Sequence, residues 1–377
     1  MTVTNKYLIV RNLSILCLIG NLLYFIFPFQ PVLWRIVFVL LCLYCIGQSY
    51  KKYKLLGFEK SVLIFTIFNL VYFFISYLWL DAPSTSFIGN VLFAMLALLL
   101  YSFLGAEKVL TDKFMMIISI IITIAGIFYF YHVKELILAR YLIGDDESVT
   151  NNGSVVFLMV LPLLFLVKNR MISIVLFCVC LFFLIYGAKR GNILAAVIPV
   201  ILYIYFFFKD DKKSVFKILT SVAVFTAITI WAIDLFFENE YLLRRMLSIK
   251  EGDSSGRDVI YANAWNLWYN SDNMINLLFG YGFQGMFHHT TRMAHNDWLE
   301  ILVDYGLMGC LLYLFIFIYF AKYILSLNSF KAKVILISVI SIWGMKTTYS
   351  MGFVEESTAI LFLAVGPILG KSKSSNI

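Results

Sequence analysis

Apolar runs long enough to cross a membrane recur along the whole 377-residue chain, with short polar breaks between them. Each is roughly 18 to 20 residues, a length that spans the ~30 Å hydrocarbon core of a bilayer as an α-helix. Hydrophobic residues make up 62% of the chain and charged residues only 14%, whereas about a quarter of a soluble domain is charged. The sequence therefore predicts an all-α protein, a polytopic bundle of transmembrane helices.

We expect about twelve spans, which together form one integral membrane domain over residues 1–377. The first is expected to be a retained helix, because no small-residue cleavage signal follows it. The sixth is short, and is expected to be tilted, broken or partly re-entrant. The expected ranges are 8–27, 31–47, 61–80, 87–106, 114–132, 154–167, 171–188, 191–208, 216–236, 297–320, 334–351 and 356–370.

The positive charge of the chain sits in short loops between apolar runs, although the net charge of +8 alone would be compatible with nucleic-acid binding. Loops rich in lysine and arginine face the cytoplasm, so we expect both termini there and no nucleic acid as partner. The outer side then carries the longest polar segment, residues 237–296, as a periplasmic or extracellular loop between spans nine and ten. All six cysteines lie inside apolar runs, which argues against a disulfide framework and a zinc site.

Within that loop, Ser255 to Asp258 has the form of a helix start. Beyond it Arg257, Tyr261, Trp265 and Trp268 recur at helical spacing, which predicts an amphipathic helix on the outer membrane surface. The helix is either an interfacial anchor without chemistry or part of a site. Arg257 favours a site, because a cation beside the positive end of a helix is stabilised by an anion.

His295 and Asn296 are followed by nine residues, Gly306, two residues and Gly309. This motif, placed at the outer end of a late span after the largest outer loop, resembles the signature of the bacterial O-antigen ligase and O-antigen polymerase superfamily. Members of that superfamily build surface polysaccharide.

Three further elements strengthen the resemblance, which covers about residues 130 to 310. They are Gly187-Ala188-Lys189-Arg190-Gly191, Ser255-Gly256-Arg257 with Gly280-Tyr281-Gly282, and Arg140 followed by Asn151-Asn152-Gly153. Lys189 stands where the family often has a small hydroxyl residue, so its participation in the site stays open.

The resemblance implies a membrane glycosyltransferase at the outer face of the bacterial plasma (inner) membrane. Its donor would be an oligosaccharide on undecaprenyl diphosphate, and its acceptor a glycan or lipid, for O-antigen, lipopolysaccharide, capsule or exopolysaccharide. We favour polymerisation of repeat units over ligation of finished glycan to a lipid A core. A polysaccharide transporter or flippase is the alternative from another class, but such proteins usually show repeated halves. No cofactor is expected; a chain-length regulator and a flippase are candidate partners.

The reaction implied by the resemblance needs a base for the acceptor hydroxyl and cations around a leaving diphosphate. His295 is the expected base. We expect it to begin the helix, where the positive terminus disfavours the imidazolium and keeps the ring neutral. Its alternative is an interfacial hydrogen-bonding role. Arg257 and Arg190, and with lower rank Arg292, are the expected diphosphate ligands, because guanidinium binds phosphate oxygens in pairs. The alternative for each arginine is contact with lipid headgroups.

On a straight helix Gly306 would lie nearly beneath His295, with Gly309 about 40° away. We expect these glycines, with Asn296 of the same motif, to be structural, letting a neighbouring backbone approach closely. Glu300 and Asp304 would either neutralise basic residues or line a polar cavity. The carboxylates of residues 145–147 could hold a cation, but adjacent loop carboxylates are usually solvated, and no metal is expected.

Overall fold

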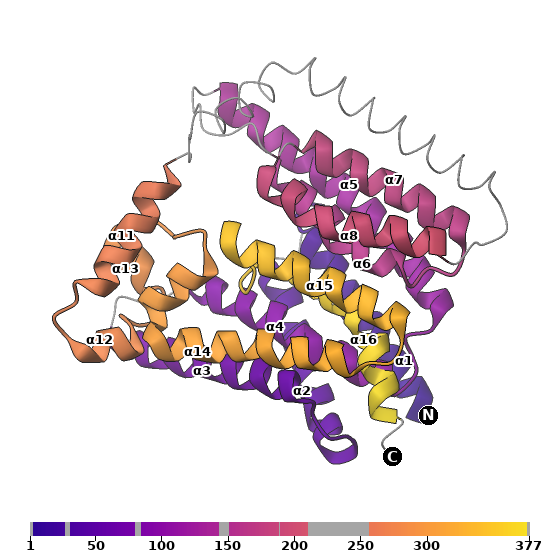
Figure 1. Ribbon diagram of the computed structural model, residues 1–377, viewed down its shortest axis with the longest axis horizontal. Coiled ribbons are helices and arrows are strands. Elements are labelled where there is room, and N and C mark those ends of the chain that lie inside the picture. Colours follow the sequence, from indigo (N-terminus) through magenta and orange to yellow (C-terminus); the bar gives the residue numbers. More distant parts are fainter. Residues whose placement is uncertain are drawn as a thin grey trace. The chain divides into compact units, whose positions relative to one another are not determined.

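The computed structural model describes residues 3–26, 31–79, 84–142, 151–187, 189–209 and 256–374. In these residues all regular secondary structure is helical (Figure 1). The chain divides into two compact units, of which unit 1 comprises Met1–Thr111 with Arg257–Ile377 and unit 2 comprises Asp112–Gly256.

Unit 1 is built around α4, whose side chains are mostly buried. The backbones of α4 and α16 lie so close together that a Cβ on Gly105 would overlap Gly366 and a Cβ on Gly370 would overlap Gly105. A Cβ on Gly366 would overlap the backbone of Tyr101 in α4. Small residues allow such backbone approach between membrane helices. The helices of this unit are α1 (Val3–Leu22), α2 (Pro31–Lys52), α3 (Gly57–Trp79), α4 (Thr85–Ala106), α11 (Arg257–Tyr269), α12 (Met274–Phe279), α13 (Gly285–Thr290), α14 (Asp297–Ser326), α15 (Phe330–Tyr349) and α16 (Thr358–Ser374).

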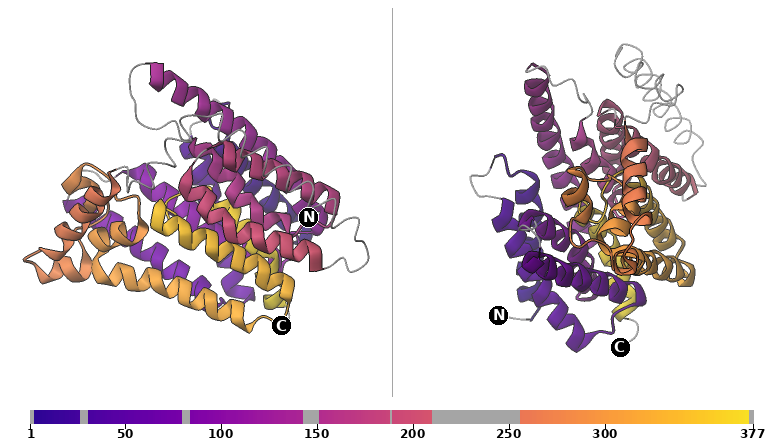
Figure 2. Two further views of the ribbon diagram at one scale, coloured as in Figure 1. Left: turned by 45° about the horizontal axis from the view of Figure 1, so that its top comes forward. Right: turned by 90° about the vertical axis from the view of Figure 1, so that its left-hand side faces the viewer.

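Ion pairs fix both ends of unit 1. At the end where α1 begins and α16 ends, Lys373 Nζ lies 2.7 Å from Glu59 Oε1, and both side chains are buried. At the other end Arg35 of α2 pairs with Glu356, which follows α15. The short helices α11, α12 and α13 gather at this second end, beside α14 (Figure 1, Figure 2).

Unit 2 packs three longer helices around a short one. The central helix α6 (Val155–Leu164) is buried throughout and follows a 3-10 turn, η1 (Asn152–Ser154). Phe157 of α6 stacks on Phe183 of α7, with ring centroids 4.6 Å apart. The surrounding helices are α5 (Asp112–Leu142), α7 (Arg170–Tyr186) and α8 (Arg190–Lys209).

A helix covers all or most of each of eleven expected spans, and the twelfth, 216–236, lies outside the described residues. Within the described part of the chain, six helices are long and apolar enough to cross a membrane. They are α2, α3, α4, α5, α8 and α14. The sixth expected span is the ten-residue α6, which covers only about half of the hydrocarbon core. The protein is an all-helical, multi-pass membrane protein, and its total of about twelve spans stays a prediction.

Candidate active site

The His-Asn pair stands directly before α14. Asn296 is the N-cap residue: its side-chain oxygen accepts a hydrogen bond from the N–H of Leu299 at 3.2 Å. Asparagine is favoured there because it satisfies an N–H that the helix leaves without a partner. His295 precedes the cap in a left-handed conformation with φ 51°, and it is exposed. The expectation that His295 begins the helix is therefore wrong, because the helix begins at Asp297.

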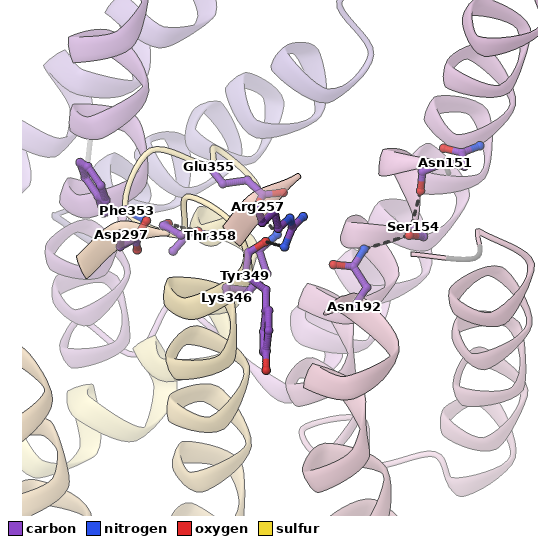
Figure 3. Close-up of polar contacts among 11 residues, drawn as sticks. Asn151, Ser154, Asn192, Arg257, Asp297, Lys346, Tyr349, Phe353, Glu355 and Thr358 are labelled. Carbon is purple, nitrogen blue, oxygen red and sulfur yellow. Dashed lines mark hydrogen bonds and ion pairs between the residues drawn. The ribbon is translucent and has the colours of Figure 1, made fainter. Parts of the chain in front are cut away.

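The last turn of α15 gathers donors from two other elements. The carbonyl of Thr348 accepts from Asn296 Nδ2 at 3.2 Å and from the hydroxyl of Tyr261 at 3.3 Å. The carbonyl of Tyr349 accepts from a guanidinium nitrogen of Arg257 at 3.2 Å (Figure 3). These carbonyls form the negative end of α15. Arg257 and Asn296 thus contact the same turn of α15, and His295 lies next to Asn296 in the chain.

The electrostatic position of Arg257 differs from the sequence-based expectation. The guanidinium does lie in the first turn of its own helix, α11, where a cation is unfavourable. However, its hydrogen bond to Tyr349 places it against the negative end of α15. The protein therefore compensates this charge itself, and a role of Arg257 in binding diphosphate stays a prediction.

Part of the face of α11 that was expected to lie on the membrane packs against protein. Arg257 and Tyr261 bond to α15, and Trp268 Nε1 donates to the carbonyl of Leu277 at 3.1 Å. Ala264, in the middle of the helix, is fully buried. Trp265 of the same face is 47% exposed, so the placement of α11 on the membrane surface stays a prediction.

Gly306 interrupts α14 with a non-helical backbone at φ 64° and ψ −162°. The carbonyls of Val303 and Asp304 instead accept from the N–H groups of Tyr281 at 2.8 Å and Gly282 at 3.0 Å. A Cβ on Gly306 would overlap the backbone of Leu278 and Phe279. The expected close backbone approach is confirmed for Gly306, but the partner is α12 and the segment that follows it, and α14 is not straight.

A second glycine, Gly280, completes this contact. Gly280, with φ 75°, lies so close to the backbone of Asp304 that a Cβ would overlap it. At Gly309, by contrast, a Cβ would meet the side chain of Tyr305 in the same helix. The Gly-Tyr-Gly and His-Asn elements, separate in the sequence, therefore form one structure through the kink of α14.

Three carboxylates in the first turns of α14 are fully buried, at 0% exposure. Glu300 Oε2 accepts from the N–H of Ala294 at 2.6 Å, and Asp304 Oδ1 accepts from the N–H of Met286 at 2.8 Å. Asp297 Oδ2 accepts from the hydroxyl of Tyr313 at 2.8 Å. Glu300 and Asp304 thus hold the backbone that leads to His295. Their two expected roles, neutralising basic residues or lining a cavity, stay predictions.

Lys346 was missed in the sequence, although it lies inside an apolar run. It is 3% exposed and forms an ion pair with Glu355, one turn before the end of α15 (Figure 3). The segment that carries Glu355 also donates the N–H of Phe353 to Asp297 Oδ2 at 3.3 Å. An ionisable residue within a predicted span is a signal for a polar site, and it could have revealed this cluster.

In unit 2 two of the weaker motif elements come together. The carbonyl of Gly187 accepts from the N–H of Asn151 at 3.0 Å. Ser154 Oγ donates to the carbonyl of Asn151 at 2.9 Å and accepts from Asn192 Nδ2 at 2.9 Å (Figure 3). Arg190 begins α8, two residues before Asn192. The Asn151 and Gly187 elements therefore form one structure, which presents Arg190.

The remaining predicted residues are placed as follows. Arg292 is exposed, close before the His-Asn pair. The carbonyl of Lys189 caps the start of α8 by accepting from the N–H of Asn192 at 3.0 Å. Among the described residues, no three His, Cys, Asp or Glu side chains gather as a metal site. Asp145, Asp146, Glu147, Ser255 and the side chain of Arg140 lie outside the described residues.

Residues 155–314 match the sequence model of the family described as O-Antigen ligase. The matched segment runs from the start of α6 into α14 and contains Arg190, Arg257 and the whole motif from His295 to Gly309. No curated protein matches the chain. The resemblance to the O-antigen ligase and O-antigen polymerase superfamily, carried by the His-Asn motif, is confirmed over residues 155–314.

Proposed function

We propose that the protein is a glycosyltransferase at the outer face of the bacterial plasma membrane, with both termini in the cytoplasm. It polymerises oligosaccharide repeat units carried on undecaprenyl diphosphate. Its superfamily supports a membrane enzyme that acts on lipid-linked glycans. The observation that carries the proposal is the convergence of Arg257 and Asn296 on the last turn of α15, which brings a cation and His295 to one end of unit 1.

The proposed reaction is a single displacement at the anomeric carbon of the donor sugar. The acceptor hydroxyl forms the new glycosidic bond, the bond to the diphosphate oxygen breaks, and the lipid diphosphate leaves as an anion. The hydroxyl proton passes to the imidazole of His295, acting as general base. This mechanism inverts the anomeric configuration, so a linkage that keeps the donor's configuration contradicts it.

Arg257 is the first candidate ligand of the diphosphate. A guanidinium has five N–H donors, and the hydrogen bond to Tyr349 uses a single nitrogen. The remaining donors suit phosphate oxygens, because charge-assisted pairs of this kind are short and strong. Arg190 and Arg292 are further candidates, and Arg190 belongs to the other compact unit.

The surroundings of His295 support a positioned base. Its backbone is fixed on one side by Glu300, which binds the N–H of Ala294, and on the other by the N-cap Asn296. Its side chain is exposed, as a group that meets a substrate from outside must be. A positioned side chain of this type contributes about 10²–10⁴-fold to rate.

The test compares His295→Ala with His288→Ala in a strain that lacks the chromosomal copy. His288 is exposed in the same outer segment and is the matched control. We expect His288→Ala to restore long surface chains and His295→Ala to leave single repeat units. If correctly inserted His295→Ala gives polymer of normal length, the proposed chemistry is wrong and a transporter or structural role is favoured.

The second candidate is ligation of finished glycan to a lipid A core or another acceptor, which the description of the matched family favours. The same strain separates the two activities. Loss of a polymerase leaves single repeat units at the surface, whereas loss of a ligase leaves long chains on the lipid carrier.

A further inference from the structure

An apolar surface covers α12 and the adjacent end of α11. Its side chains are between 42% and 68% exposed, although they lie in a segment that the charge pattern places outside the membrane. Contiguous apolar patches of this kind mark sites of protein or membrane contact. We call it the α12 surface; its residues are Trp265, Tyr269, Met274, Ile275, Leu278 and Phe279.

The outward orientation of these side chains is fixed by the other side of α12. The hydroxyl of Tyr72, on the span α3, donates to the carbonyl of Phe279 at 2.9 Å. Trp268 Nε1 donates to the carbonyl of Leu277 at 3.1 Å. The backbone of Leu278 lies against Gly306. The backbone of α12 is therefore held by α3, α11 and α14. The exposed side chains of α12 lie on the side away from these contacts.

The position of α12 along α14 gives its depth. From Gly306 to the end of α14 at Ser326 is about 20 residues, or ~30 Å of helix, which matches the hydrocarbon core. If Ser326 lies at the inner boundary, Gly306 lies at the outer one, and α12 packs across it.

The α12 surface also continues the surfaces of the two spans that hold it. On α3 and α14 the neighbouring exposed residues are apolar as well: Phe74, Ile75, Leu78, Leu307, Met308 and Leu311. On spans of this length and hydropathy, such side chains face lipid. Trp265 and Tyr269 stack at the end of the surface, and these residue types favour the level of the headgroups.

We infer that the α12 surface is seated in the outer leaflet of the bilayer, at the boundary between headgroups and acyl chains. The bilayer is its partner, and α12 lies along the boundary as an interfacial anchor. This contact with lipid holds the segment that leads to His295 at a fixed level above the membrane. This inference rests on exposure, packing and depth, and is independent of the proposed chemistry.

The test measures the environment of single nitroxide labels on the full-length protein, reconstituted as one copy per lipid nanodisc. Labels replace Met274, Ile275 or Leu278 through introduced cysteines, with the six native cysteines changed to alanine. Asn263, exposed on the opposite side of α11, gives the control label. We expect collisions with oxygen, which dissolves in acyl chains, to exceed those with a water-soluble nickel chelate severalfold at the three α12 positions. At Asn263 we expect the reverse.

Two results overturn the inference. Strong collision with nickel at the α12 positions shows a surface in water. Weak collision with both reagents shows a surface covered by protein, either another part of the chain or a second copy.

A second measurement keeps the native cysteines. Ile275→Asp and Asn263→Asp are compared by thermal unfolding in nanodiscs. If the α12 surface lies in lipid, Ile275→Asp should have a lower Tm than the wild type and Asn263→Asp should not, because a charge at the hydrocarbon boundary is unfavourable. Equal Tm values contradict the inference.

Discussion

The kink of α14 offers a sharp test of how the His-Asn segment is held, through Gly306→Ala. The φ of 64° and ψ of −162° at Gly306 fall in a region that non-glycine residues occupy at a cost of about 1–3 kcal/mol. The new Cβ would also overlap the backbone of Leu278 and Phe279. Backbone cannot swing aside as a flexible side chain does, so overpacking adds about 1–3 kcal/mol. The expected loss is ~2–6 kcal/mol, the sum of these two ranges.

The matched control is Gly344→Ala on α15, where a Cβ meets no atom within 4 Å. Alanine in a helix is more favourable than glycine by roughly 0.5–1 kcal/mol, so this variant should be as stable as the wild type or more so. Thermal unfolding of the purified proteins in nanodiscs, followed by tryptophan fluorescence, compares the three chains. We expect Gly306→Ala to lower Tm by about 4 °C or more, since 1 kcal/mol moves Tm by about 2–4 °C in chains of 150–250 residues.

If Gly306→Ala unfolds at the same temperature as the wild type and Gly344→Ala, the backbone contact between α12 and α14 does not hold the segment. The account of the Gly-Tyr-Gly and His-Asn motifs as one structure would then be wrong.

Substitutions at three further sites test other contacts of unit 1 by thermal unfolding. Glu300→Gln keeps an acceptor for the N–H of Ala294, whereas Glu300→Ala leaves that buried N–H without its partner, at a cost of about 1–3 kcal/mol; equal Tm values would show that this bond is dispensable. Asn296→Asp keeps the capping oxygen and loses the Nδ2 donor to Thr348, whereas Asn296→Ala loses both. The cap is worth about 1 kcal/mol, so Asn296→Ala should have the lower Tm, and the opposite order would refute the capping role. Lys373→Met removes the ion-pair partner of buried Glu59 and should cost about 3–5 kcal/mol. Adding Glu59→Gln should recover most of this loss, and a double variant no more stable than Lys373→Met would contradict the pairing.

The helices could be predicted from the sequence because apolar length alone determines them. A membrane-spanning segment must satisfy its own backbone hydrogen bonds, and each of eleven apolar runs lies on a helix. The shortness of α6 could be predicted in the same way, from the short apolar run of the sixth expected span. The start of α11 at Arg257 could also be predicted, because the Ser-x-x-Asp pattern reports a local structure.

The conformation around His295 could not be predicted, because tertiary contacts determine it. The motif predicted where the histidine lies along the chain, but not its left-handed backbone. The kink at Gly306 depends on hydrogen bonds from Tyr281 and Gly282, more than twenty residues earlier. A helix assumed to be straight therefore gave the wrong relation between His295 and Gly306.

The charged residues at the end of unit 1 where α11, α12 and α13 gather were overlooked for a different reason. Lys346 and Arg35 lie inside runs whose average hydropathy is high, and averaging conceals a single charge. Their partners Glu355 and Glu356 lie in the short segment between α15 and α16. Only the folded chain shows that each cation has a carboxylate beside it.

The most direct measurement is the turnover of the purified protein on a repeat unit linked to undecaprenyl diphosphate, for His295→Gln and His288→Gln. Glutamine keeps polarity but is not a base near neutral pH. If His295 accepts the proton of the attacking hydroxyl, its variant loses about 10²–10⁴-fold in kcat, while His288→Gln keeps wild-type turnover. Wild-type turnover by His295→Gln would contradict the account.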